Sequence, residues 1–153
     1  MATFISHSPA ETQSLGEEWG RDADRGLVIG LSGELGAGKT QLVKGLGKGL
    51  GIPERIHSPT FTLLNIYHGG RLSLFHLDLY RLQNREQVSA AGLEDYFHPD
   101  GVAVIEWAER WFGNTVSSAQ GSKPQSLPGI FRSVLIEATD EFERRITYED
   151  FGS

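Results

Sequence analysis

The spacing of hydrophobic residues changes along the chain, and each change predicts an element. Leu27–Ser32 is an apolar run of strand length. From Lys39 to Leu50, apolar residues recur at helical spacing, and Gly51 and Pro53 then end the pattern. A glycine-rich segment separates the two. The order strand, loop, helix is therefore predicted for the first third of the chain.

The remaining segments predict short strands and helical turns. Thr3–Ser6 predicts a strand. Ser8 is the expected N-cap of a following helix, with Pro9 in its first turn and Glu11 completing a capping box. Later predictions are a hairpin (61–67 with 72–77), helical turns (84–91, 92–97 and 108–112), a buried strand (102–105) and a closing hairpin (133–138 with 145–149).

Composition and charge narrow the class of protein. The 153 residues include no cysteine, which excludes disulfides and thiolate–metal sites. No signal peptide or membrane-length apolar run is visible, so we expect a cytoplasmic protein of one domain, residues 1–153. The net charge of -6 argues against a broad basic surface that binds nucleic acid unaided. The polar stretch 113–129 predicts a mobile surface loop.

The loop between the first buried strand and its helix fits the pattern G-x-x-x-x-G-K-[ST]. Backbone N–H groups of such a loop point at phosphate oxygens, and the helix N-terminus adds its positive end. Lys39 is expected to reach the β- and γ-phosphates, and the Thr40 hydroxyl to ligate Mg²⁺. The predicted nucleotide-binding residues are Gly33, Glu34, Leu35, Gly36, Ala37, Gly38, Lys39 and Thr40.

With this loop, the predicted architecture is an α/β, P-loop NTPase-like sandwich. Its central sheet is expected to be mostly parallel and to carry antiparallel hairpin strands.

Hydrolysis of a triphosphate also needs an acid near the metal. Glu106 follows the buried strand 102–105, where it is placed to hold Mg²⁺ or to polarise the attacking water. Asp78 is a second candidate for metal ligand or base, because alternation places it on one face with Leu74 and His76. A solvent-exposed strand-end Glu and a turn Asp are the alternative readings.

Three further residues are candidates with simpler alternatives. Thr60, in Ser58-Pro59-Thr60, is placed to sense the γ-phosphate, or it belongs to an ordinary turn. Trp107 packs either against the nucleotide or in the core. Arg81 either stabilises transition-state charge or is a surface residue. The five histidines show no metal-ligand spacing, so no metal other than Mg²⁺ is predicted.

Five blocks in order resemble the TsaE (YjeE) ATPases of bacterial tRNA threonylcarbamoyladenosine synthesis. The blocks are the glycine loop at 33–40, Ser-Pro-Thr-Phe at 58–61, His-Leu-Asp-Leu-Tyr-Arg at 76–81, Gly-Leu-Glu-Asp-Tyr at 92–96 and Val-Ile-Glu-Trp at 104–107. The loop alone is generic, but the five together are specific and span most of the chain. The stretch 113–129 departs from the family by being longer and more polar.

The resemblance implies a small ATPase that acts with TsaB and TsaD. In that family, ATP hydrolysis supports transfer of threonylcarbamoyl to an adenosine of tRNA, and tRNA is met through the complex. The family's functional residues correspond here to Lys39, Thr40, Thr60, Asp78, Glu106 and Trp107.

Two other functions remain open from the residues alone. A small-molecule kinase is one, although an arginine-rich lid is lacking, since the stretch 113–129 contributes only Lys123. A GTP-dependent switch is the other, although no Asn-Lys-x-Asp motif for guanine occurs. Because the only candidate for an arginine finger is Arg81, slow hydrolysis by the isolated chain is predicted.

Overall fold

The structure is a computed structural model that describes residues 2–34, 37–57, 63–113 and 129–152. Its strands are β1 (Ala2–Ser6), β2 (Leu27–Ser32), β3 (Leu64–Tyr67), β4 (Leu74–Asp78), β5 (Val102–Glu106), β6 (Ile130–Ala138) and β7 (Arg144–Gly152). Its α-helices are α1 (Pro9–Asp22), α2 (Lys39–Gly49), α3 (Arg85–Ala90) and α4 (Glu109–Phe112), and a 3₁₀ helix spans Leu93–Phe97.

All seven strands form one mixed sheet in the order β1-β7-β6-β2-β5-β4-β3. The inner strands β6, β2, β5 and β4 are parallel to their neighbours in this group. Antiparallel pairs β6–β7, β1–β7 and β3–β4 complete the two margins. The predicted mixed sheet, with parallel central strands and antiparallel hairpins, is thus confirmed.

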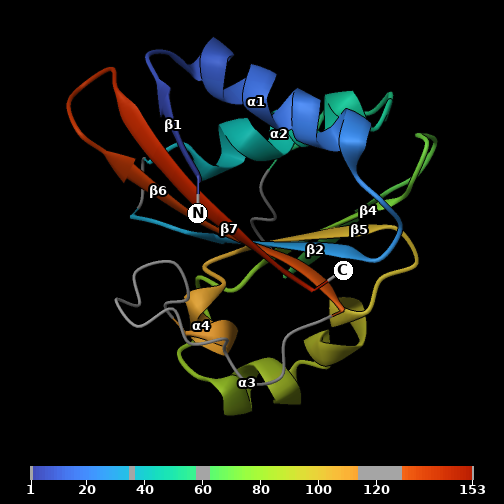
Figure 1. The fold of residues 1–153 in the computed structure, drawn as a ribbon. Helices are drawn as coiled ribbons and strands as arrows, with labels where there is room; N and C mark the ends of the chain where they lie inside the picture. The colour runs from blue at the N-terminus through green and yellow to red at the C-terminus, as the bar shows by residue number, and fades with distance from the viewer. Residues whose placement is uncertain (1, 35–36, 58–62, 114–128, 153) are drawn as a thin grey trace.

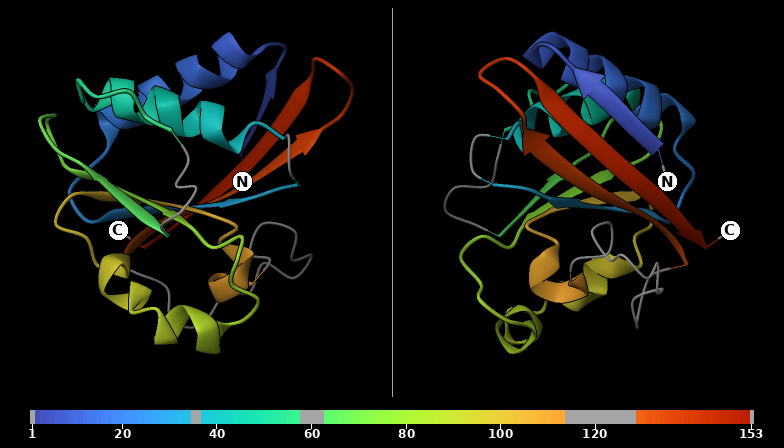
Figure 2. Two further views of the ribbon diagram at one scale, coloured as in Figure 1. Left: turned by 180° about the vertical axis from the view of Figure 1, so that it is seen from behind. Right: turned by 60° about the vertical axis from the view of Figure 1, so that its left-hand side comes forward.

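Helices cover both faces of this sheet (Figures 1 and 2). Helices α1 and α2 lie together on one face, and α3, α4 and the 3₁₀ helix lie on the other. Each face has its own apolar core. Leu31, Leu74 and Val104 point toward α1 and α2, whereas Leu77 and Ile105 point toward the opposite layer. Alternation along each strand therefore tells which layer a polar side chain faces.

Helix α1 begins as predicted, with one difference in its cap. The Ser8 side chain accepts a hydrogen bond from the backbone N–H of Glu11 at 3.1 Å. The Glu11 carboxylate accepts from the backbone N–H of His7 at 3.3 Å, one residue before the cap. The expected reciprocal bond to Ser8 is thus replaced by a bond to its neighbour.

Glycines bring α1 and α2 unusually close. A Cβ atom at Gly16 or Gly20 would lie 2.2 or 2.4 Å from a backbone oxygen of α2. A Cβ atom at Gly45 or Gly49 would lie 2.0 or 2.1 Å from a backbone oxygen of α1. Because α2 starts at Lys39, this contact also fixes where the glycine loop ends.

Several predicted boundaries shift. The closing strands are longer than predicted because β6 and β7 pair along Ile130–Ala138 and Arg144–Gly152. Strand β4 begins at Leu74, later than predicted. Strand β3 spans Leu64–Tyr67, and residues 61 and 62 of the predicted strand lie outside the described residues. The segment 114–128 lies outside the described residues, so the predicted loop at 113–129 stays a prediction. Within the described part of the chain, no helix is long and apolar enough to cross a membrane.

Candidate functional site

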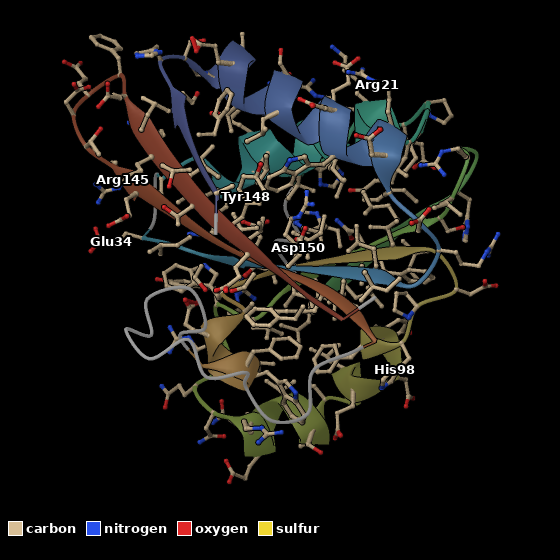
Figure 3. All side chains as sticks on the ribbon, viewed as in Figure 1. Arg21, Glu34, His98, Arg145, Tyr148 and Asp150 are labelled. Carbon is tan, nitrogen blue, oxygen red and sulfur yellow. The ribbon has the colours of Figure 1, made fainter. Side chains whose placement is uncertain are left out.

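The glycine loop connects β2 to α2 at the edge of the sheet where β2 ends (Figure 1). Gly33 has a φ of +148°, and a Cβ there would lie 2.5 Å from the backbone oxygen of Ile136. Gly38 is the N-cap of α2 with a φ of +102°. Both positions therefore favour glycine. Glu34 is exposed beside the end of β2 (Figure 3), and Leu35 and Gly36 lie outside the described residues.

Lys39, the first residue of α2, is 5% exposed. Its Nζ donates hydrogen bonds to the backbone oxygens of Gly33 and Glu34, the latter at 2.9 Å. Burial lowers the pKa of the Lys39 ammonium, and the nearby Glu106 carboxylate opposes this shift most strongly. The Lys39 ammonium thus contacts carbonyl oxygens of the glycine loop and also lies near the carboxylates of Glu106 and Asp78.

Asp78 and Glu106 end two adjacent parallel strands. They are direct partners in the register of β4 and β5. Glu106 follows Val104 by two residues and Asp78 follows Leu74 by four, so alternation turns both carboxylates toward the layer that contains α2. Sequence alternation anticipated the orientation of Asp78, and the pairing of β4 with β5 brings the two acids together.

The two acids differ in their surroundings. Asp78 is half-buried, and its Oδ1 accepts a hydrogen bond from the backbone N–H of Tyr80 at 3.0 Å. Burial raises the pKa of the Asp78 carboxyl, while this hydrogen bond opposes the rise. Glu106 is 4% exposed, and its Oε2 lies 2.6 Å from Nε2 of the fully buried His76. The alternative reading of Glu106 as a solvent-exposed strand-end residue is therefore wrong.

The sequence reasoning assigned no role to His76. The usable signal was its place in β4, two residues before Asp78 and on the same face.

Trp107 lies directly after β5 in a left-handed conformation, with a φ of +61°. Such a conformation is costly for a bulky residue. Its ring centroid is 4.3 Å from Nζ of Lys39 and 5.1 Å from the ring centroid of Tyr80. The indole is half-buried and packs against the apolar layer of α3 and α4. Trp107 therefore touches both the core and the lysine of the loop.

A hollow of about 520 Å³ adjoins the loop on the α4 side. Its lining includes Ser32, Gly33, Trp107 and Glu109. Burial raises the pKa of the Glu109 carboxyl, and a hydrogen bond with Ser32 opposes the rise. The sequence reasoning missed Glu109, because a carboxylate in a short helical turn carries no pattern that points to a site.

The remaining predicted residues divide into three cases. Thr40 is the second residue of α2 and so lies at the N-terminus of that helix. Thr60 lies outside the described residues. Arg81 is exposed, in agreement with its reading as a surface residue.

Magnesium is bound in proteins by one or two carboxylates together with substrate phosphates and water. Two carboxylates at adjacent strand ends, with a threonine at the start of α2, fit that requirement. No cluster of three or more His, Asp or Glu residues that could hold a metal ion alone occurs among the described residues. The donor set therefore suits a cation that arrives with phosphate oxygens.

Comparison with known proteins identifies the family of this chain. The family model "Threonylcarbamoyl adenosine biosynthesis protein TsaE" matches residues 6–144. A TsaE protein from Nostoc sp. is 53% identical over 145 residues, covering 92% of this chain and 81% of the relative. A Bacillus subtilis TsaE is 35% identical over 146 residues, covering 95% and 84%. The crystal structure of Bacillus subtilis YdiB superposes with a TM-score of 0.70 at 32% identity, covering 96% of this chain and 83% of that one.

The family match covers most of the chain, and the relatives align along most of their own length. The chain belongs to the TsaE family of threonylcarbamoyl adenosine biosynthesis proteins.

Proposed function

We propose that this protein binds ATP with Mg²⁺ at the glycine loop and hydrolyses it slowly. The hydrolysis supports threonylcarbamoyl transfer to a tRNA adenosine, carried out with TsaB and TsaD homologues in the cytoplasm. The observation that carries the proposal is the convergence of Lys39, Asp78 and Glu106. These residues come from α2, β4 and β5, and they meet on one face at the carboxyl edge of the parallel strands. That edge is where α/β sheets bind their ligands.

In this function, the start of α2 binds the phosphates through its backbone N–H groups. Lys39 exchanges its loop carbonyl partners for phosphate oxygens, which is favourable because a charged partner makes the stronger hydrogen bond. Thr40 and one of the two acids, Asp78 or Glu106, would hold Mg²⁺. The chemistry supplied by the bound ion is neutralisation of charge on the β- and γ-phosphate oxygens. Whichever acid does not touch the metal orients the attacking water.

We expect slow hydrolysis by the isolated chain because its candidate for an arginine finger lies at the protein surface. Arg81, the candidate for an arginine finger, is exposed. An arginine finger accelerates phosphoryl transfer by about 10³–10⁵. A partner protein that supplies such a charge, or that times product release, would therefore set the rate. Because the net charge is -6, contact with tRNA is expected through the complex.

The test combines binding and turnover. ATP hydrolysis is measured for the purified protein alone and with TsaB and TsaD homologues, and the homologues are used as bait in pull-downs with and without ATP. Slow turnover alone and co-purification with the homologues are expected. Fast turnover by the protein alone would contradict the dependence on partners. Stoichiometric phosphate transfer to a small acceptor would instead establish a kinase.

A further inference from the structure

The contact between His76 and Glu106 joins two buried side chains on neighbouring strands. His76 is 0% exposed and Glu106 is 4% exposed, and 2.6 Å separates the imidazole Nε2 from the carboxylate Oε2. An ionised carboxylate can only accept hydrogen bonds, so the imidazole donates from Nε2–H. The other ring nitrogen, Nδ1, has no hydrogen-bond partner among the described residues. Among the described residues, the His76 ring therefore makes its hydrogen bond to Glu106.

Packing alone does not explain a histidine at this position. Its neighbours in sequence, Phe75 and Leu77, are apolar, and its partner Val104 in β5 belongs to the apolar core under α1 and α2. Its partner in β3 is the polar Asn65, whose side-chain amide donates to the Tyr67 hydroxyl and to the backbone oxygen of His57. Leucine would fill a similar volume there without burying polar nitrogens, whereas burial of an imidazole with one nitrogen unpaired is unfavourable. The cost is understandable if the histidine serves the carboxylate that it contacts.

The register of the sheet explains how this contact forms. The direct partner of His76 in β5 is Val104, and Glu106 follows it by two residues on the same face. The imidazole therefore reaches along the strands toward their carboxyl ends, where Asp78 and Lys39 also lie. The imidazole approaches from the core side, because its own side chain is fully buried.

We propose that His76 is a positioning residue that holds the Glu106 carboxylate in one orientation through the Nε2–H hydrogen bond. This inference rests on the proposed ATP hydrolysis. A carboxylate fixed before the reaction needs no rearrangement when charge develops in the transition state. His76 acts through Glu106 and does not itself contact nucleotide. Its removal should therefore lower kcat and leave nucleotide affinity largely unchanged.

Two amide substitutions provide a matched pair. In His76→Gln, the side-chain amide reaches the place of Nε2 and can still donate to Glu106. In His76→Asn, the shorter side chain reaches only the place of Nδ1. With the partners present, we expect His76→Asn to lower kcat by about 10–100-fold, as loss of a supporting hydrogen bond does at metal sites. We expect His76→Gln to recover most of that loss, and KM for ATP to change by less than about threefold in both variants.

A double-mutant cycle separates positioning from general damage. If His76 acts through Glu106, His76→Asn should cause little further loss of kcat in a Glu106→Gln background. An equal loss in both backgrounds would overturn the proposal, and so would equal kcat values for the Gln and Asn variants. Thermal unfolding of each variant shows whether it is folded. If His76→Asn does not fold, the kcat of His76→Gln tests the proposal instead. A loss of kcat in His76→Gln as large as the loss in Glu106→Gln would contradict the positioning role.

A second readout needs no nucleotide, metal or turnover. In the ring-¹⁵N-labelled protein, the Nε2–H proton of His76 should resonate downfield and be protected from exchange with water. Glu106→Gln should move it upfield, because a neutral acceptor makes a weaker hydrogen bond. No such resonance, or no change on substitution, overturns the contact. If the parent hydrolyses no ATP even with its partners, the proposed function fails, while this spectrum still tests the hydrogen bond.

Discussion

The close approach of α1 and α2 gives a prediction whose size can be worked from the structure. In Gly45→Ala, the new Cβ would lie 2.0 Å from the backbone oxygen of Gln13 and 2.7 Å from its carbonyl carbon. An ordinary contact of 3.4 Å exceeds the oxygen distance by 1.4 Å. Since both atoms are backbone, no rotamer change relieves the clash, and the two helices must move apart.

Two effects of opposite sign set the magnitude. Overpacking of a core usually costs about 1–3 kcal/mol, and separation of the helices also weakens dispersion contacts of Leu15, Leu42 and Leu46 across the gap. Alanine gains about 1 kcal/mol over glycine in helix propensity. Because the clash is with backbone atoms, the upper part of the overpacking range applies, and we expect a net loss of about 1–2 kcal/mol in the free energy of unfolding. For a chain of this size, that lowers Tm by about 2–8 °C.

Urea and thermal unfolding of the parent and of Gly45→Ala measure this loss. The matched control is Ser14→Ala, which places an alanine at an exposed position of α1. It should change the free energy of unfolding by less than about 0.5 kcal/mol. Because α2 carries Lys39 at its start, Gly45→Ala is also expected to weaken ATP binding, measured by calorimetry. A Gly45→Ala protein as stable as the Ser14→Ala control would refute the close helix contact.

Three further predictions concern the site. Lys39→Ala should abolish ATP binding in calorimetry, whereas Glu106→Ala should spare binding more than hydrolysis; equal activity of both variants and the parent would refute the assignment. Burial raises the pKa of Asp78, so its native carboxyl keeps its proton to higher pH than the unfolded one, and ionisation costs stability near neutrality. Asp78→Asn should therefore unfold at higher urea than the parent at pH 7, with the difference shrinking as pH falls through the raised pKa of the native Asp78 carboxyl toward the ordinary range of Asp; a constant difference would contradict this. Nucleotide binding should change Trp107 fluorescence by moving the Lys39 ammonium from its ring, and Trp107→Phe should remove the change, whereas an unaltered signal would show that another tryptophan reports it.

Local rules account for much of the fold. The apolar run of β2, the spacing of α2 and the Ser8 cap depend on residues close in sequence, and each was predicted near its observed position. The orientation of Asp78 followed from alternation in one strand. The predicted ends of the strands were less accurate. Strands β6 and β7 pair along their full length, and the sequence of one strand does not reveal how far its partner extends it.

The sequence by itself determined the strand–loop–helix unit, the candidate acids and, through five motif blocks, the resemblance to TsaE that the family comparison confirms. The tertiary structure alone decided that β4 and β5 are neighbours, and hence that His76 meets Glu106 across 30 residues of chain. It also decided that Lys39 lies against Trp107 and that Glu109 borders the loop. The physical reason is range. Periodicity and capping are set within a few residues, whereas these contacts depend on which strands pair and which layers pack.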